Sequence, residues 1–72
     1  MITPGTYRHY KGPLYEVVGE ARHSETEEAL VVYWALYGER GLWVRPLAMF
    51  TETVVVDGLE QPRFALVSPA AG

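Results

Sequence analysis

His23, Ser24 and Glu25 carry the side chains of a general base, a nucleophile and an orienting carboxylate in consecutive positions. A catalytic triad aligns these groups in space, and adjacent residues rarely achieve that alignment because their side chains diverge from the backbone. We therefore expect local roles in a turn, with Ser24 or Thr26 hydrogen-bonding to the backbone and His23 bridging to a neighbouring carboxylate. The sequence predicts no catalytic residue, and only a lone general base at His23 stays open.

Three basic side chains, Arg8, His9 and Lys11, form one short group, and Arg45 and Arg63 are among the basic residues that occur singly. Guanidinium groups bind carboxylates and phosphates through paired N–H donors, so the arginines are candidates for a small cationic pocket. The competing interpretation, which we favour, is that they are solvated strand residues paired with glutamates. In a regular strand Arg8 and His9 also point to opposite faces, so one pocket takes only one of them.

Four aromatic residues, Tyr33, Trp34, Tyr37 and Trp43, flank the glycine-bounded segment 38–41. If that segment is a hairpin turn, cross-strand neighbours among them form a platform suited to a peptide, a cationic group or a stacked base. Aromatic rings also supply much of the core of a small domain, and we favour that role for most of them. We expect at least one tryptophan to stay partly exposed.

The candidate ligand surface that follows is the side carrying Tyr33, Trp43 and Arg45, with His23 at its rim. It rests on strand alternation, because Trp43 and Arg45 flank Val44, which we take as a core residue. A fully buried Trp43 together with an Arg45 locked in an internal ion pair would exclude it.

Composition narrows the classes of function. The chain has 72 residues, no cysteine, two histidines and a net charge of -3. The negative charge disfavours nucleic acid, since binding to a polyanion is driven by positive charge. Two histidines at no ligand-like spacing and no thiolate predict no metal site, and no glycine-rich phosphate loop is present, so we expect no cofactor. Without a basic, apolar leader or a run of about 18 apolar residues, we expect a cytoplasmic protein that does not enter a membrane.

Short β-type segments separated by turn residues run along the whole chain. We expect strands at Thr6–Tyr10, Leu14–Arg22, Ala29–Tyr37, Leu42–Arg45, Thr53–Val56 and Arg63–Val67. In the second strand, alternation places Tyr15, Val17, Gly19 and Ala21 on one face, and Gly19 indicates a bulge. The apolar third strand is predicted to be central and covered on both faces. We expect a hairpin connection at 23–28. A short helix capped by Ser24 competes with it, but the β-rich run that follows argues against the helix.

The predicted fold class is all-β, a small SH3-like open barrel of five or six strands or a strongly bent antiparallel sheet. One short helical turn is expected at Leu47–Phe50, after Pro46, and Asp57-Gly58 predicts a tight turn. We expect one domain over residues 1–72, with its core at 5–67 and a frayed tail at 68–72. Because so short a chain buries a small core, a monomer or a weak homodimer is expected.

Several of these segments together resemble a known family, the bacterial domain-of-unknown-function family 1653. The similarity lies in Tyr7–Gly12, Ala21–Thr26, Leu36–Gly38, Trp43–Leu47, Met49-Phe50 and Pro62–Phe64, in this order and spacing. The resemblance implies a small bacterial domain without an established activity, sometimes joined to other domains. The family pattern has a polar or basic residue where this chain has Trp34, and often an apolar one at Glu27. An outward Trp34 would turn Tyr33 and Ala35 inward.

The function expected from the sequence is a noncatalytic binding or accessory module that recognises a peptide or protein partner through an aromatic-lined surface. The alternative is a small-molecule or nucleotide-binding protein, possibly an enzyme component, that holds a small anionic ligand with Arg8 or Arg63 and His23. A concave site with converging polar groups and a histidine of shifted pKa would favour this alternative.

Overall fold

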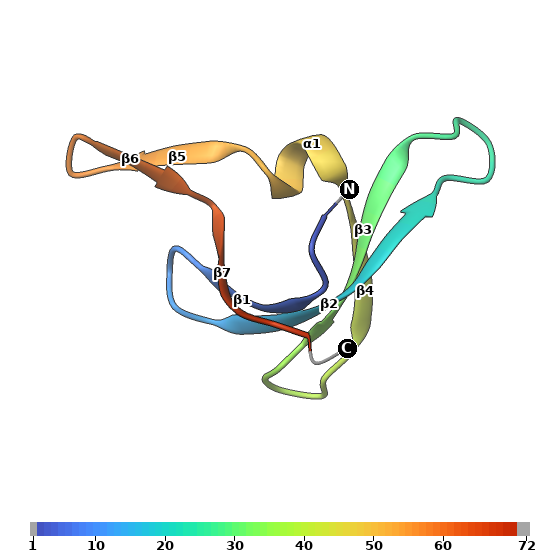
Figure 1. Ribbon diagram of the computed structural model, residues 1–72, viewed down its shortest axis with the longest axis horizontal. Helices are drawn as coiled ribbons and strands as arrows, with labels where there is room; N and C mark the ends of the chain where they lie inside the picture. The colour runs from blue at the N-terminus through green and yellow to red at the C-terminus, as the bar shows by residue number, and fades with distance from the viewer. Residues whose placement is uncertain (1, 71–72) are drawn as a thin grey trace.

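The computed structural model describes residues 2–70 (Figure 1). The elements in chain order are β1 (Gly5–His9), β2 (Leu14–Arg22), β3 (Ala29–Ala35), β4 (Leu42–Pro46), α1 (Leu47–Phe50), β5 (Thr53–Val56), β6 (Leu59–Pro62) and β7 (Phe64–Pro69). Five strands form one antiparallel sheet in the order β4-β3-β2-β1-β7, and β5 and β6 form a separate hairpin. The all-β class, the bent open sheet and the helical turn at Leu47–Phe50 are confirmed, but the described residues contain more strands than the five or six predicted.

A bulge in β2 bends the sheet. Val17 pairs with Tyr33 of β3, whereas Gly19 already pairs with Val32, so the register shifts between Val17 and Gly19. The extra residue confirms the bulge predicted at this glycine. It also exchanges the faces beyond it, because side chains alternate from one residue to the next. Gly19 and Ala21 therefore do not share the face of Val17, and that part of the prediction was wrong.

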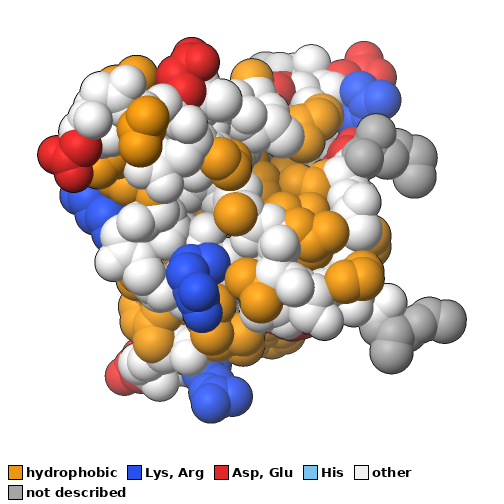
Figure 2. Space-filling view, turned by 60° about the vertical axis from the view of Figure 1, so that its left-hand side comes forward, with side chains coloured by type: hydrophobic (Ala, Val, Ile, Leu, Met, Phe, Trp, Pro, Cys, Tyr) orange, Lys and Arg blue, Asp and Glu red, His pale blue; other side chains and the backbone are white. Residues whose placement is uncertain are grey.

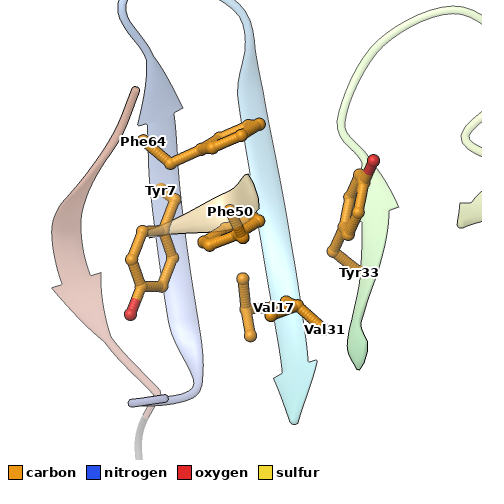
Figure 3. Close-up of a cluster of buried hydrophobic side chains, with 6 residues drawn as sticks. All are labelled: Tyr7, Val17, Val31, Tyr33, Phe50 and Phe64. Carbon is orange, nitrogen blue, oxygen red and sulfur yellow. The ribbon is translucent and has the colours of Figure 1, made fainter. Parts of the chain in front are cut away.

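The core lies on the concave side of the sheet, under α1 (Figures 1 and 3). Its buried side chains come from β1, β2, β3, α1 and β7: Tyr7, Val17, Val31, Tyr33, Phe50 and Phe64. The N-terminal segment enters this space, where Ile2 packs against the cluster. One layer of side chains between the sheet and a single helical turn thus supplies most of the buried apolar surface.

β3 is central in the sheet but is covered on one face. Val31, Tyr33 and Ala35 are buried, while Trp34 between them is 43% exposed. The expectation of burial on both faces was wrong, and the alternative in which Trp34 points outward is confirmed. Hydrophobic side chains also reach the surface elsewhere, and Figure 2 shows them between separate charged groups on the side that carries the β5–β6 hairpin.

The β5–β6 hairpin was predicted only in part. Asp57 and Gly58 have φ values of 51° and 78°, and Val56 pairs with Leu59 across them, which is the geometry of a type I′ turn. β6 itself was not predicted, since a segment ending in proline has low β propensity.

The last strand extends further than expected. β7 continues to Pro69, because Ser68 and Pro69 pair with Thr6 and Gly5 of β1. The frayed tail predicted from residue 68 was therefore wrong for residues 68 and 69, and residues 71–72 lie outside the described part. β7 is an edge strand of the sheet, as predicted, and the other edge is β4.

Candidate binding site on the concave face

Phe64 is the centre of an aromatic cluster at the start of β7. Its ring stacks on Phe50, with centroids 4.1 Å apart, and meets His9 edge to face at 4.9 Å and Tyr15 at 5.5 Å. Tyr33 lies 6.4 Å away. Edge-to-face and stacked aromatic pairs stabilise a core beyond their buried area. The cluster fixes the floor on which the polar groups of the concave face lie.

Arg45 is held against this floor. It pairs with buried Val31, and paired residues of neighbouring strands share a face, so its side chain lies on the concave side. The Cζ atom is 5.5 Å from the Phe64 ring centroid, in cation–π geometry,. The Nε atom is buried without a hydrogen-bond partner. Among residues 2–70 no carboxylate pairs with Arg45, so the expectation of a strand arginine neutralised by a glutamate does not hold for it.

Arg63 behaves differently, because its charge is compensated. Its Nη2 atom bonds to Oε1 of Glu52, with side chains 26% and 44% exposed. The two residues are also joined through the main chain, where Arg63 N–H donates to the Glu52 carbonyl over 3.1 Å. The Arg63 carbonyl in turn accepts from Tyr10 N–H at 2.9 Å. The expected pairing with a glutamate is confirmed here.

His9 lies beside these cations. Its Nδ1 accepts a hydrogen bond from Lys11 N–H at 3.2 Å, so the neutral ring carries its proton on Nε2. Burial lowers the pKa of His9 below 6.5, and the positive charges of Arg63, Arg45 and Lys11 lower it further. The imidazole is therefore neutral near pH 7 and presents an N–H donor. The histidine of shifted pKa is His9, whereas the sequence had drawn attention to His23.

Tyr15 and Tyr37 add hydroxyl groups to the same face. Their oxygen atoms are 3.0 Å apart. The pKa of Tyr15 is raised to about 12, first by burial and then by the hydrogen bond and charge of Tyr37 and by Tyr33, while Arg45 acts in the opposite direction. The Tyr15 hydroxyl thus stays protonated near neutral pH. Because one hydroxyl donates to the other, one O–H of the pair remains to donate elsewhere.

Trp43 lies at the outer end of this face, on the edge strand β4. It pairs with buried Tyr33 and is 59% exposed. Val44 was predicted to be a core residue, and this was wrong: it pairs with Val32 on the other face and is 56% exposed. Trp43 also covers Gly41, where an added Cβ would lie 3.0 Å from the indole Nε1.

His23 serves a local role in the β2–β3 loop. Its Nδ1 accepts hydrogen bonds from the main-chain N–H groups of Glu25 and Thr26, at 3.1 and 3.3 Å. The Thr26 hydroxyl accepts from Glu28 N–H at 3.3 Å, which confirms the predicted bond to turn backbone. The segment is a turn and not a helix. The loop lies beyond the Ala29 end of β3, so the structure does not bring His23 to the Trp43 surface (Figure 1).

Arg8 is likewise separate from Arg45 and Arg63. It is exposed on β1 and lines a surface pocket of about 220 Å³ that contains neither of the other arginines. The pocket is lined by Arg8, His9, Tyr10, Gln61, Pro62, Ala65 and Val67. Arg8 pairs with Leu14 at the start of β2, and Arg63 is bonded to nearby Tyr10, whereas His23 follows the other end of β2. The arrangement of Arg8 or Arg63 with His23, expected for a nucleotide site, is therefore not formed.

Phe64 and Tyr15 were not among the candidate site residues. Tyr15 had a usable signal, since alternation placed it on the face of Val17,. Phe64 had none, because its position depends on the pairing of His9 with Phe64 between the first and last strands.

Metal chemistry finds no support in the part of the chain that is described. Residues 2–70 contain no group of three or more histidine, cysteine, aspartate or glutamate side chains placed to hold an ion. The helix in residues 2–70 has four residues. No helix among these residues is long and apolar enough to cross a membrane.

The fold defines a small all-β domain whose concave face carries aromatic rings and cationic groups. Over residues 5–66 the sequence matches the family described as "Protein of unknown function (DUF1653)", and the chain belongs to this family. It is similar to the protein of the same family from Bordetella bronchiseptica whose crystal structure is known. The two share 44% identity and a TM-score of 0.87, over 99% of this chain and 94% of the other. No curated protein matches the sequence.

Proposed function

We propose that this domain is a noncatalytic binding module that takes up an extended segment of a protein partner along β4. The observation that carries the proposal is Trp43, 59% exposed beside buried Tyr33 on an edge strand of the sheet. Large aromatic side chains at an exposed edge supply much of the binding energy in peptide recognition. As parts of the same proposal, the fold is SH3-like and the protein acts in a bacterial cytoplasm, where a small domain without cysteine needs no disulfide,.

The main chain of β4 is suited to strand addition. Ala35 N–H donates to the Gly41 carbonyl at 3.1 Å, and in an antiparallel pair hydrogen-bonded and non-hydrogen-bonded residues alternate. Trp43 therefore directs its main-chain groups to β3, whereas Leu42 and Val44 direct theirs away from the sheet. An added strand pairs with these two residues, and Pro46, which lacks an N–H, ends the available edge.

The edge exposes apolar side chains on both faces. Leu42 is 52% and Val44 56% exposed on one face, and Trp43 lies on the other. Exposed apolar edge strands are usually protected in proteins, because they associate with other strands. A partner segment with apolar side chains at alternate positions fits this edge.

A peptide segment fits the edge better than a second copy of the chain. β4 has five residues, and self-pairing along so short a strand buries less than the roughly 1,000 Å² of a stable interface. Two copies would each bring a net charge of -3, which opposes their association. An extended peptide offers main-chain hydrogen bonds to the edge without the net negative charge of a second copy. Its affinity is expected to be modest, as for other short recognition segments.

The test is amide-shift mapping by NMR with a panel of short apolar peptides, nucleotides and oligonucleotides. We expect the Leu42 and Val44 amides to shift with peptides only. Val44→Pro removes an outward N–H without breaking the hydrogen bonds between β3 and β4. We expect peptide affinity to fall at least about tenfold, which is the effect of losing one to two main-chain hydrogen bonds. Val44→Thr, similar in shape and with the N–H intact, is the control. Peptide shifts away from β4, equal binding by Val44→Pro, a nucleotide response, or a β4-mediated dimer would overturn the proposal.

A further inference from the structure

Arg45 is a cation that the described part of the protein leaves without a counterion. We propose that Arg45, His9 and the Tyr15–Tyr37 hydroxyl pair form a binding site for a carboxylate, above the ring of Phe64. The site lies on the concave face and uses the side chains around Phe64, whereas the peptide edge proposed above uses Trp43 and the outward main-chain groups of β4. The inference therefore goes beyond that function and does not rest on it.

The guanidinium of Arg45 is ordered before any ligand arrives. Its Cζ lies 5.5 Å from the Phe64 centroid, and Phe64 is itself fixed by stacking on Phe50 at 4.1 Å. The Nε atom is covered and has no acceptor, and it is the one nitrogen of Arg45 that is both buried and unpartnered. The terminal nitrogens of the fork are therefore left to meet a ligand. A partly desolvated guanidinium forms strong charge-assisted hydrogen bonds with a carboxylate.

Neutral donors lie around the same ring. His9 and Tyr15 contact Phe64 at 4.9 and 5.5 Å, and the charge of Arg45 acts on both residues. Because Lys11 N–H occupies Nδ1 of His9, the imidazole proton is on Nε2. The hydroxyls of Tyr15 and Tyr37, 3.0 Å apart, leave one O–H to donate. One charged fork and two neutral donors match the two oxygens of a carboxylate, which accept several hydrogen bonds.

The charge balance selects a monoanion. Arg63 is compensated by Glu52, and His9 is neutral near pH 7 because its pKa is lowered. Lys11 is exposed and lies over the Tyr10 ring, 5.7 Å from its centroid. The Nε atoms of Arg45 and Arg63 are both buried without a partner, but Arg45 is the one of the two that no described carboxylate balances. A bound carboxylate balances the charge of Arg45, whereas a phosphate dianion would leave one negative charge uncompensated.

The walls of the site are aromatic, so the body of the ligand next to the carboxylate is expected to be apolar or aromatic. The carboxylate has two sources that share this chemistry, a free organic acid or an acidic side chain of a polypeptide. Benzoate represents the first source, and a short peptide with one glutamate represents the second.

The experiment is an NMR titration of the full chain with benzoate, followed at His9 and at the Arg45 Nε–H. We expect saturable shifts at both groups and a rise in the pKa of His9 when benzoate is bound, since a neighbouring carboxylate favours the imidazolium. Arg45→Gln should weaken binding roughly tenfold or more, the size of one charge-assisted hydrogen bond. Arg8→Gln removes the same charge from the exposed face of β1 and should leave affinity unchanged.

Further arms separate the remaining alternatives. Tyr37→Phe removes an exposed hydroxyl and should lower the affinity for benzoate several-fold, which keeps a test available if Arg45→Gln fails to fold. Val44→Pro changes the peptide edge and should bind benzoate as the unchanged chain does. If the glutamate peptide binds more tightly than both its glutamine version and benzoate, the natural carboxylate belongs to a polypeptide. If benzoate binds more tightly than the glutamate peptide, it belongs to a free acid. Three results would overturn the proposal. They are an equal loss of benzoate affinity in Arg8→Gln and Arg45→Gln, tighter binding of phosphate or uncharged benzamide than of benzoate, and the absence of saturable shifts at His9.

Discussion

Phe50 and Phe64 stack face to face, with ring centroids 4.1 Å apart and planes 3° from parallel. The contact joins α1 to the start of β7, and Tyr7 of β1 meets Phe50 edge to face at 5.4 Å. The helix has four residues and no side-chain cap at its N-terminus, so its stability comes mainly from this packing and not from its own hydrogen bonds. The pair therefore fixes both the concave core and the floor under Arg45.

Removing the Phe50 ring should unfold much of the protein. Phe50→Ala deletes a side chain that is 1% exposed, and such truncations cost about 3–5 kcal/mol. That loss is a large part of the roughly 5–15 kcal/mol that stabilises a typical domain. Urea unfolding followed by tryptophan fluorescence measures it. Met49→Ala, at a neighbouring position that is 46% exposed, should cost less than about 1 kcal/mol, and equal losses in the two variants would contradict this account.

Gly5 is the position where a single methyl group should be most disruptive. Its φ of 147° disfavours other residues, and an added Cβ would collide with the Ser68 carbonyl oxygen, the Pro69 Cα at 2.8 Å and the Ala70 N at 2.9 Å. Backbone strain and overpacking each cost about 1–3 kcal/mol, so Gly5→Ala should destabilise the β1–β7 pairing severely. Gly12 has a φ of 117° and open space around its Cβ position, so Gly12→Ala is the control that carries backbone strain without a collision. The denaturation midpoint of Gly5→Ala should fall well below that of Gly12→Ala; the opposite order would exclude the steric explanation.

The elements that the sequence predicted are those with local signals. β2 and β5 have the predicted bounds, and α1 covers the predicted Leu47–Phe50, because turn residues and proline mark their ends. β6 was missed because its pairing is imposed by the type I′ turn before it and not by the propensity of its own residues. The continuation of β7 through Ser68 and Pro69 has a similar origin, since strand β1 supplies the partner.

The site was predictable only where neighbouring strands build it. The pairing of Tyr33 with Trp43 follows from the β3–β4 hairpin, and the outward position of Trp34 came from the family resemblance. The meeting of His9, Arg45 and Phe64 depends on the bend of the sheet and on β1–β7 pairing between chain ends. Alternation alone reversed the assignment of Val44, because an error of one residue in register exchanges the faces.

Stability should decrease as the pH falls below about 6.5, the pKa of a histidine in an unfolded chain. In the folded protein the pKa of His9 is lowered by burial and by the positive charges of Arg63, Arg45 and Lys11. Of these three cations, Arg63 is paired with a carboxylate, that of Glu52. The unfolded state therefore binds more protons between the folded pKa and 6.5, and the free energy of unfolding rises with pH across that window. Urea midpoints measured from about pH 7 to 5 test this. His9→Asn should flatten the slope, and an unchanged slope would rule out His9 as its source.

Tyr15 should lose its proton only at high pH, because burial and Tyr37 raise its pKa to about 12. Tyr37→Phe removes a hydrogen bond and a charge that raise this pKa, and should lower it while burial keeps it above 10.0. Arg45→Gln should raise it, because the guanidinium favours the tyrosinate,. Unfolded tyrosine loses its proton near 10, so the unfolded state binds fewer protons between pH 10 and 12 and stability falls as the pH rises through that range. Carbon NMR of labelled tyrosine rings resolves the titration, and shifts of the same sign in both variants would disprove the arrangement of Arg45, Tyr15 and Tyr37 that the structure shows.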